Sequence, residues 1–303
     1  MSKTNEPSTT GRIEKKFRHL AETNKKAVIP FTVLGFPDKE TSLRSIEALI
    51  AGGAHVLELG LPFSDPMADG PIIEAAAKQT VEQGFSIADA LELIATVRQR
   101  HPELPIVILS YFNLAFARGV EPFLQQLKKA GADGITFVDL PVEECAETYK
   151  QAAAIGLAPV MLVSPLTSPE RLAKILEYAE GYIYLVSRAG ITGLEETFNS
   201  GLKSLINMIK QSSTLPVCIG FGISRPIHVR GMIAHGADGV IVGSKIVAMI
   251  QGSQTSFNPD ELSAFVQELV LAAQDAVPPK EEKAKNCLFE VPVKDKEKIE
   301  VAK

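Results

Sequence analysis

The sequence predicts an α/β fold: a barrel of eight parallel strands alternating with helices, the (β/α)8 or TIM barrel. One extra helix precedes the first strand, and an extra helical segment follows the second. Three observations support this prediction: eight short apolar runs, amphipathic segments between them, and a glycine-containing phrase that recurs where a helix gives way to a strand. No G-x-G-x-x-G motif follows the first apolar run, which argues against an open dinucleotide-binding sheet.

The predicted strands are short and continuously apolar, as is typical of parallel strands that are buried on both faces. They span residues 27–33, 55–59, 106–110, 134–138, 158–163, 182–187, 216–219 and 239–242. Because the runs number eight, the pattern favours a closed barrel over an open doubly wound sheet.

Segments with a 3.6-residue apolar period separate the strands. They lie at 41–50, 120–129, 143–154 and 169–178. The step from the second to the third strand is the longest, and it leaves room for a helical segment near 72–82 before a helix at 87–100. The recurring phrase reads AGGA at 51–54, AGADG at 130–134 and HGADG at 235–239, and its glycine is expected to end each helix in a left-handed cap.

The two ends of the chain differ from the middle. Residues 1–11 are polar and rich in Ser, Thr, Pro and Gly, and we expect them to be disordered. Residues 12–277 form the predicted barrel domain, which is expected to be catalytic. Residues 278–303 are a charged tail, which we interpret as a solvated extension.

Composition excludes several classes of protein. The net charge is −5 and no basic block precedes the tail, so a nucleic-acid-binding role has little support. No apolar run reaches the ~18 residues of a membrane span, and the start of the chain has no signal-peptide core. The three cysteines, Cys145, Cys218 and Cys287, are too scattered for a disulfide framework or a clustered zinc site. We expect a cytoplasmic protein.

The active site of such a barrel lies at the carboxyl ends of its strands, and the titratable residues there are mainly carboxylates. None of the five histidines falls at such an end, so a metal site and a Ser-His-Asp triad are both disfavoured. Lys245 is the only lysine near a strand end. Because a helix begins there, it is a poor candidate for Schiff-base chemistry.

Glu58 is the unexpected residue of the second strand, because strand interiors rarely hold a lone carboxylate. Near the end of its strand it would point into the barrel mouth, where desolvation raises a carboxyl pKa toward neutrality and suits general acid–base work. Asp69 follows on a loop that can fold over the same mouth. The residues alone also allow a purely structural interpretation. In it, Glu58 pairs with a buried arginine or a backbone amide, and Asp65 and Asp69 only form turns.

The last two strand ends indicate a phosphate site. The segment GFGIS at 220–224 and the pair Gly243-Ser244 present backbone N–H groups beside helix starts, where barrels often bind phosphate. The alternative is that these glycines only turn the chain. After the sixth strand, the polar, glycine-hinged stretch from Arg188 to about Ser200 is either a lid that excludes water or a plain surface loop.

These motifs resemble one known family. The stretch LELGLPFSDPMADGP at 57–71 closely resembles the signature of the tryptophan synthase α subunit. The resemblance spans roughly residues 13–275 and continues through Pro30-Phe31, Asp139-Leu140-Pro141, residues 181–188 and 190–193, and the two glycine segments named above. It implies retro-aldol cleavage of indole-3-glycerol phosphate to indole and glyceraldehyde 3-phosphate.

The resemblance also implies roles for individual residues. Glu58 would be the acid–base residue, and Asp69 would accept a hydrogen bond from the indole N–H. The remaining positions fall into four groups. The phosphate would bind at Gly193, Gly222, Gly243 and Ser244; Phe31, Tyr111 and Tyr184 would wall the indole pocket; Arg188, Gly190 and Thr192 would belong to the lid; and Pro62, Asp65, Asp139 and Pro141 would face a partner.

The implied partner is a tryptophan synthase β subunit in an α2β2 assembly, which makes tryptophan from the released indole. Its pyridoxal phosphate would belong to the β subunit, so no cofactor and no metal is expected on this chain. Two other interpretations stay open. One is another phosphate-binding barrel enzyme of the same pathway, which would need lysines at strand ends, and the other is a non-catalytic barrel that only activates or seals its partner.

Overall fold

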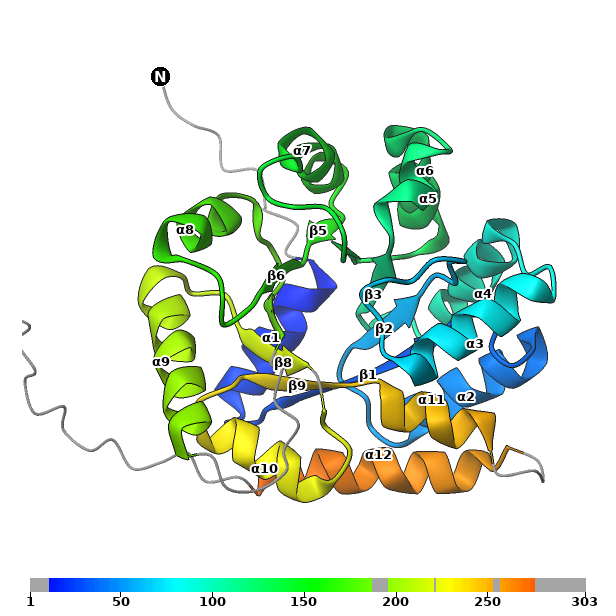
Figure 1. Ribbon diagram of the computed structural model, residues 1–303. Coiled ribbons are helices and arrows are strands. Elements are labelled where there is room, and N and C mark those ends of the chain that lie inside the picture. The colour runs from blue at the N-terminus through cyan, green and yellow to red at the C-terminus, as the bar shows by residue number, and fades with distance from the viewer. Residues whose placement is uncertain (1–10, 187–195, 221, 253–256, 276–303) are drawn as a thin grey trace, which may run out of the picture.

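The structure is a computed structural model that describes residues 11–186, 196–220, 222–252 and 257–275. The charged tail and the N-terminal segment up to residue 10 lie outside the described residues, as does most of the predicted lid. Figure 1 shows a ring of helices around a central set of strands.

The strands form one parallel sheet that closes into a barrel. They are β1 (Ala27–Val33), β2 (Leu57–Gly60), β3 (Ile106–Ser110), β4 (Gly134–Phe137), β5 (Ala158–Pro159), β6 (Met161–Val163), β7 (Ile183–Val186), β8 (Val217–Gly220) and β9 (Gly239–Val242). The order around the sheet is β5-β4-β3-β2-β1-β9-β8-β7-β6. β5 and β6 are the two halves of the single strand predicted at 158–163. Because β5 pairs with β4 and β6 pairs with β7, this segment closes the ring, and the eight-stranded prediction is confirmed.

The helices cover the outside of the barrel, apart from the first. They are α1 (Arg12–Glu22), α2 (Lys39–Ala51), α3 (Pro71–Glu82), α4 (Ile87–Arg100), α5 (Phe112–Phe116), α6 (Val120–Ala130), α7 (Ala146–Ala154), α8 (Pro169–Tyr178), α9 (Glu196–Ser212), α10 (Pro226–Ala234), α11 (Ser244–Gln251) and α12 (Pro259–Gln274). The extra segment predicted at 72–82 is α3. No helix among the described residues is long and apolar enough to cross a bilayer.

Two boundaries differ from the prediction by more than two residues. The predicted lid stretch runs to about Ser200, but α9 already begins at Glu196, so its last residues are helical. The helix predicted at 143–154 begins only at Ala146, after Pro141 and the turn that follows it. The short α5 after β3 has no counterpart in the prediction, because five residues are too few to show a helical period.

The recurring glycine phrase does more than end helices. The residue that follows Gly-Ala in each copy caps the start of the neighbouring strand. The Asp133 carboxylate accepts a hydrogen bond from the N–H of Ile106 at 2.9 Å, and Asp238 accepts one from Val217 at 3.1 Å. After the copy at 51–54 the equivalent residue is His55, whose Nδ1 accepts a hydrogen bond from the N–H of Val28 at 3.1 Å. Burial, with nearby lysines, lowers the pKa of His55 to about 4, so the ring is neutral and able to accept.

The amino end of the barrel is closed by α1. Its apolar face, Ile13, Phe17 and Leu20, is buried, and the Phe17 ring lies 5.7 Å from that of Tyr182. Figure 1 shows this helix inside the ring of other helices. The open mouth for a ligand is therefore at the carboxyl ends of the strands.

Candidate active site

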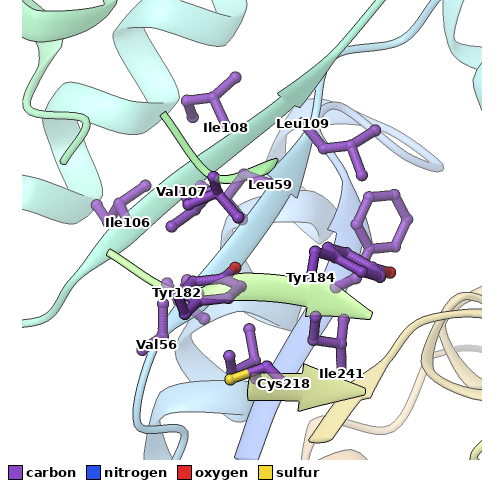
Figure 2. Close-up of a cluster of buried hydrophobic side chains, with 14 of the residues drawn as sticks. Val56, Leu59, Ile106, Val107, Ile108, Leu109, Tyr182, Tyr184, Cys218 and Ile241 are labelled. Atoms are coloured by element: carbon purple, nitrogen blue, oxygen red, sulfur yellow. The ribbon is translucent and has the colours of Figure 1, made fainter. Parts of the chain in front are cut away.

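Alternate residues of each strand point into the barrel. In Figure 2, Val107 and Leu109 project from β3 toward the interior, where Tyr182 and Tyr184 also lie. Glu58 is paired in register with Val107 on one side and with Phe31 on the other, so its side chain points inward with them. The strand pattern therefore places the anomalous carboxyl inside the barrel.

Glu58 has no exposed surface, and neither of its carboxylate oxygens has a hydrogen-bond partner. The alternative that it pairs with a buried arginine or an amide is thus wrong for this structure. Burial, which disfavours the charged form, raises the pKa of Glu58 from its ordinary 4.5 to about 8. The nearby charge of Asp69 raises the pKa of Glu58 further. The Tyr182 hydroxyl lowers it in part, although its geometry does not meet that of a hydrogen bond.

Asp69 sits on the loop between β2 and α3 and reaches over the same mouth. Its Oδ2 accepts a hydrogen bond from the Tyr111 hydroxyl at 2.9 Å, and that hydroxyl accepts the N–H of Ala68 at 3.0 Å. The Phe63 ring stacks on Tyr111 with 5.0 Å between centroids. Burial raises the pKa of Asp69, and the hydrogen bond from Tyr111 partly offsets this. Tyr111 therefore anchors the loop and orients the carboxyl.

Two glycines make room for the aromatic rings in the mouth. A Cβ on Gly60 would lie 2.7 Å from the Phe31 ring, and one on Gly220 would lie 2.5 Å from the Tyr184 hydroxyl. Phe31 and Tyr184 are both nearly fully buried. The predicted aromatic walls thus lie in the barrel mouth because the adjacent strand residues have no side chains.

The predicted phosphate end lies on the far side of the mouth from Tyr111. Gly243 caps α11, which begins directly after the carboxyl end of β9, so the first N–H groups of this helix lie at the mouth, and its first residue, Ser244, is exposed. Gly222 is exposed and adopts a φ of 74°, a conformation that favours glycine. Gly193 lies outside the described residues, as do the lid residues Arg188, Gly190 and Thr192.

Three of the four predicted partner-facing residues are exposed. Asp65, Asp139 and Pro141 lie in the loops after β2 and β4, and Asp139 also accepts the N–H of Phe112 at 2.7 Å. Pro62 is buried. The same face exposes large apolar side chains that sequence reasoning missed, among them Met67 at 86% and Phe116 at 71%.

Other features of the described residues do not compete with this site. No group of three or more His, Cys, Asp or Glu side chains in them is arranged to hold a metal ion. A cavity of about 400 Å³ lies between the loop after β4 and α8, but neither Glu58 nor Asp69 lines it. A second, of about 350 Å³, lies at the amino end of the barrel beside α1.

Sequence reasoning missed the polar groups that share the interior with Glu58. Tyr182 is fully buried with its hydroxyl unpaired, and so is the hydroxyl of Thr136 on β4. The strand pattern indicates which way such residues point, but it cannot show that a hydroxyl lacks a partner. Gly60 and Gly220 were visible as glycines at strand ends, which is a recognised sign of close approach.

Comparison with known proteins adds independent evidence. The family model described as "Tryptophan synthase alpha chain" matches residues 17–275. A tryptophan synthase alpha chain from Methanoregula boonei is 42% identical over 266 residues, which is 88% of this chain and 98% of that protein. The crystal structure of tryptophan synthase subunit alpha from Legionella pneumophila has a TM-score of 0.80 at 35% identity, covering 87% of this chain and 98% of that one. A chain of the tryptophan synthase complex from Pyrococcus furiosus has a TM-score of 0.73, also at 35% identity, covering 81% and 98%.

Proposed function

Because the chain belongs to the tryptophan synthase alpha chain family, it is a carbon–carbon lyase that cleaves indole-3-glycerol phosphate, and we propose that Glu58 and Asp69 perform the cleavage. The observation that supports these roles best is the fully buried Glu58 carboxyl, which has no hydrogen-bond partner and a pKa of about 8 beside Asp69. At neutral pH such a group still holds its proton and can give it away.

The reaction needs one proton delivered and one removed. The Glu58 carboxyl donates its proton to indole C3, which becomes tetrahedral and leaves an indolenine cation. The resulting carboxylate then takes the proton of the hydroxyl on the side-chain carbon attached to C3. The bond between that carbon and C3 breaks, its electron pair restores the neutral indole ring, and the aldehyde of glyceraldehyde 3-phosphate forms. Glu58 ends the cycle protonated, as it began.

Asp69 stabilises the cation. Positive charge develops at the ring nitrogen when C3 is protonated. A carboxylate that accepts a hydrogen bond from the indole N–H stabilises this charge. Tyr111 supports this role because its hydroxyl already holds one Asp69 oxygen at 2.9 Å and leaves the other for the substrate. Electrostatic stabilisation of this kind contributes about 10²–10³ in rate.

The rest of the substrate spans the mouth. Phe31 and Tyr184 wall the indole, and the N–H groups near Gly222, Gly243 and Ser244 bind the phosphate, joined by Gly193. The helix that begins at Ser244 supports this placement. Arg188, Gly190 and Thr192 form a lid that closes over the bound ester and excludes water.

The partner is a tryptophan synthase β subunit, which takes the released indole. We infer an α2β2 assembly in which the loops holding Asp65, Asp139 and Pro141 face that subunit and transmit closure between the sites. Pyridoxal phosphate belongs to the β subunit, and the alpha reaction as written needs no cofactor of its own. A cytoplasmic location fits the two described cysteines, Cys145 and Cys218, which are buried free thiols.

The test is an assay of indole release from indole-3-glycerol phosphate, with and without a β subunit. Glu58→Gln should lose far more than the ~10²–10⁴ of a single proton-transfer aid, because the carboxyl acts twice. Asp69→Asn should lose about 10²–10³. Glu180→Gln, a surface change at the amino end of the barrel, is the matched control and should behave like wild type. Undiminished turnover by Glu58→Gln would reject these roles.

A further inference from the structure

Thr136 is a buried hydroxyl without a partner inside the catalytic barrel. Its side chain has no exposed surface, and Oγ1 makes no hydrogen bond with any described residue. An unsatisfied buried hydroxyl costs about 1–3 kcal/mol, so folded proteins rarely keep one without a use. A bound ligand with a polar atom at this point would remove that cost.

The hydroxyl faces the barrel mouth. Thr136 on β4 is paired in register with Leu109 on β3, and Figure 2 shows Leu109 on the interior side of its strand. Thr136 is also the last inward-facing residue of β4, which ends one residue later. It therefore lies at the level of the active site and not at the closed amino end.

The strand order places this hydroxyl opposite the phosphate end. From β4 to β9 there are four steps around the eight-stranded ring in either direction, so the two strands are diametrically opposed. The proposed phosphate site lies after β8 and β9, and Asp69 is tied to Tyr111 after β3. A substrate stretched between them turns the six-membered ring of its indole toward β3 and β4.

Unsubstituted indole gives Thr136 nothing to bond. Its single polar group, the N–H, is assigned to Asp69, and the hydroxyls and phosphate belong to the other end of the substrate. We propose that Thr136 is a specificity-determining residue, whose hydroxyl makes this site accept indoles that carry a hydrogen-bonding substituent, such as a hydroxyl, on the six-membered ring. The proposal rests on the proposed function, because it uses the orientation that the proposed function gives the substrate.

The test runs the reaction in the direction of condensation. Indole and the four hydroxyindoles substituted at positions 4, 5, 6 and 7 are each supplied with glyceraldehyde 3-phosphate, and kcat/KM is measured. The readout is the ratio of kcat/KM for each hydroxyindole to that for indole. Because it is a ratio, a partly folded variant does not distort it. Thr136→Val keeps the shape and removes the hydroxyl, and Thr136→Ser keeps the hydroxyl.

Thr32 supplies the matched control. Its hydroxyl is also fully buried and unpaired, but it alternates with the inward Phe31 and therefore faces the helices. We expect Thr136→Val to lower the ratio for at least one hydroxyindole by about five- to tenfold, with Thr136→Ser and Thr32→Val near the wild-type ratio. A Thr136→Val ratio equal to wild type for all four, or a wild type that accepts no hydroxyindole, would overturn the proposal. Failure of wild type with indole itself would instead contradict the proposed function.

Discussion

At the scale of the residue, the buried and half-buried carboxyls of the barrel have two opposite kinds of surroundings. Asp133 is held by Arg98 at 2.6 Å and Asp238 by Lys210 at 2.8 Å, so both charges are neutralised at the amino end. Glu58 has no such partner and is surrounded by Tyr182, Tyr184 and apolar side chains. An ionic partner favours the charged form of a carboxyl, whereas a buried carboxyl without one keeps its proton and is available for chemistry.

This difference predicts how Glu58 affects stability. Below pH 4.5 the carboxyl is protonated in both the folded and the unfolded chain. Between pH 4.5 and about 8 only the folded chain keeps the proton, so the free energy of unfolding falls as pH rises, and above pH 8 the loss is complete. Wild type should therefore become less stable than Glu58→Gln by about 3–5 kcal/mol across this window.

Urea unfolding of both proteins at a series of pH values measures the difference. Comparing two variants at each pH cancels the titration of every other group. A difference that stays constant from pH 4.5 to 8 would contradict a raised pKa for Glu58.

At the scale of the element, the shape of the mouth depends on small residues at the ends of strands. Gly60 ends β2 and Gly220 ends β8, and each faces an aromatic ring on a neighbouring strand. The rings of Phe31 and Tyr184 can lie inward only because these positions have no Cβ.

Gly60→Ala should therefore damage the site more than the fold. The added methyl would lie 2.7 Å from the Phe31 ring and would push it into the proposed indole pocket, so kcat/KM should fall on the order of tenfold or more, since small misplacements are costly in a preorganised site. Gly231→Ala in α10 is the control, because a Cβ there meets nothing within 4 Å. An equal effect of both changes on indole release would contradict this explanation.

The helices and strands also show how much of the fold could be predicted from the sequence. Periodicity predicted every strand, because each is continuously apolar, and it predicted the insertion that is α3. It could not divide the strand at 158–163, since the break after Pro159 reflects pairing with strands distant in the chain. The phrase AGADG predicted helix ends, but Asp133 as the cap of β3 depends on which strand lies beside β4.

At the scale of the whole molecule, the two ends of the barrel have different tasks. The amino end is closed by α1 and tied by ion pairs of Arg12, Arg98 and Lys210. The carboxyl end keeps the uncompensated Glu58 and exposes Met67 and Phe116. Single exposed apolar residues are ordinary, but several on the face that also bears the predicted partner loops indicate a contact surface.

A change at Phe116 should thus weaken assembly. Phe116→Glu puts a charge where an apolar side chain is 71% exposed, and the Kd for the β subunit should rise about tenfold or more while the isolated chain keeps its fold. Leu271→Glu is the matched control, since Leu271 is 51% exposed on α12, away from the mouth. Calorimetric titration with a β subunit measures both. Equal affinities for the two variants would place the partner elsewhere.

We propose that one acid, Glu58, is shielded from water in the barrel mouth and still holds its proton at neutral pH. The most direct measurement is a ¹³C NMR titration of the chain labelled at glutamate carboxyl carbons, with the Glu58 signal assigned by its absence from Glu58→Gln. We predict that this signal titrates near pH 8. A midpoint near the ordinary 4.5 would contradict the account, because the group would then be a carboxylate with no proton to give.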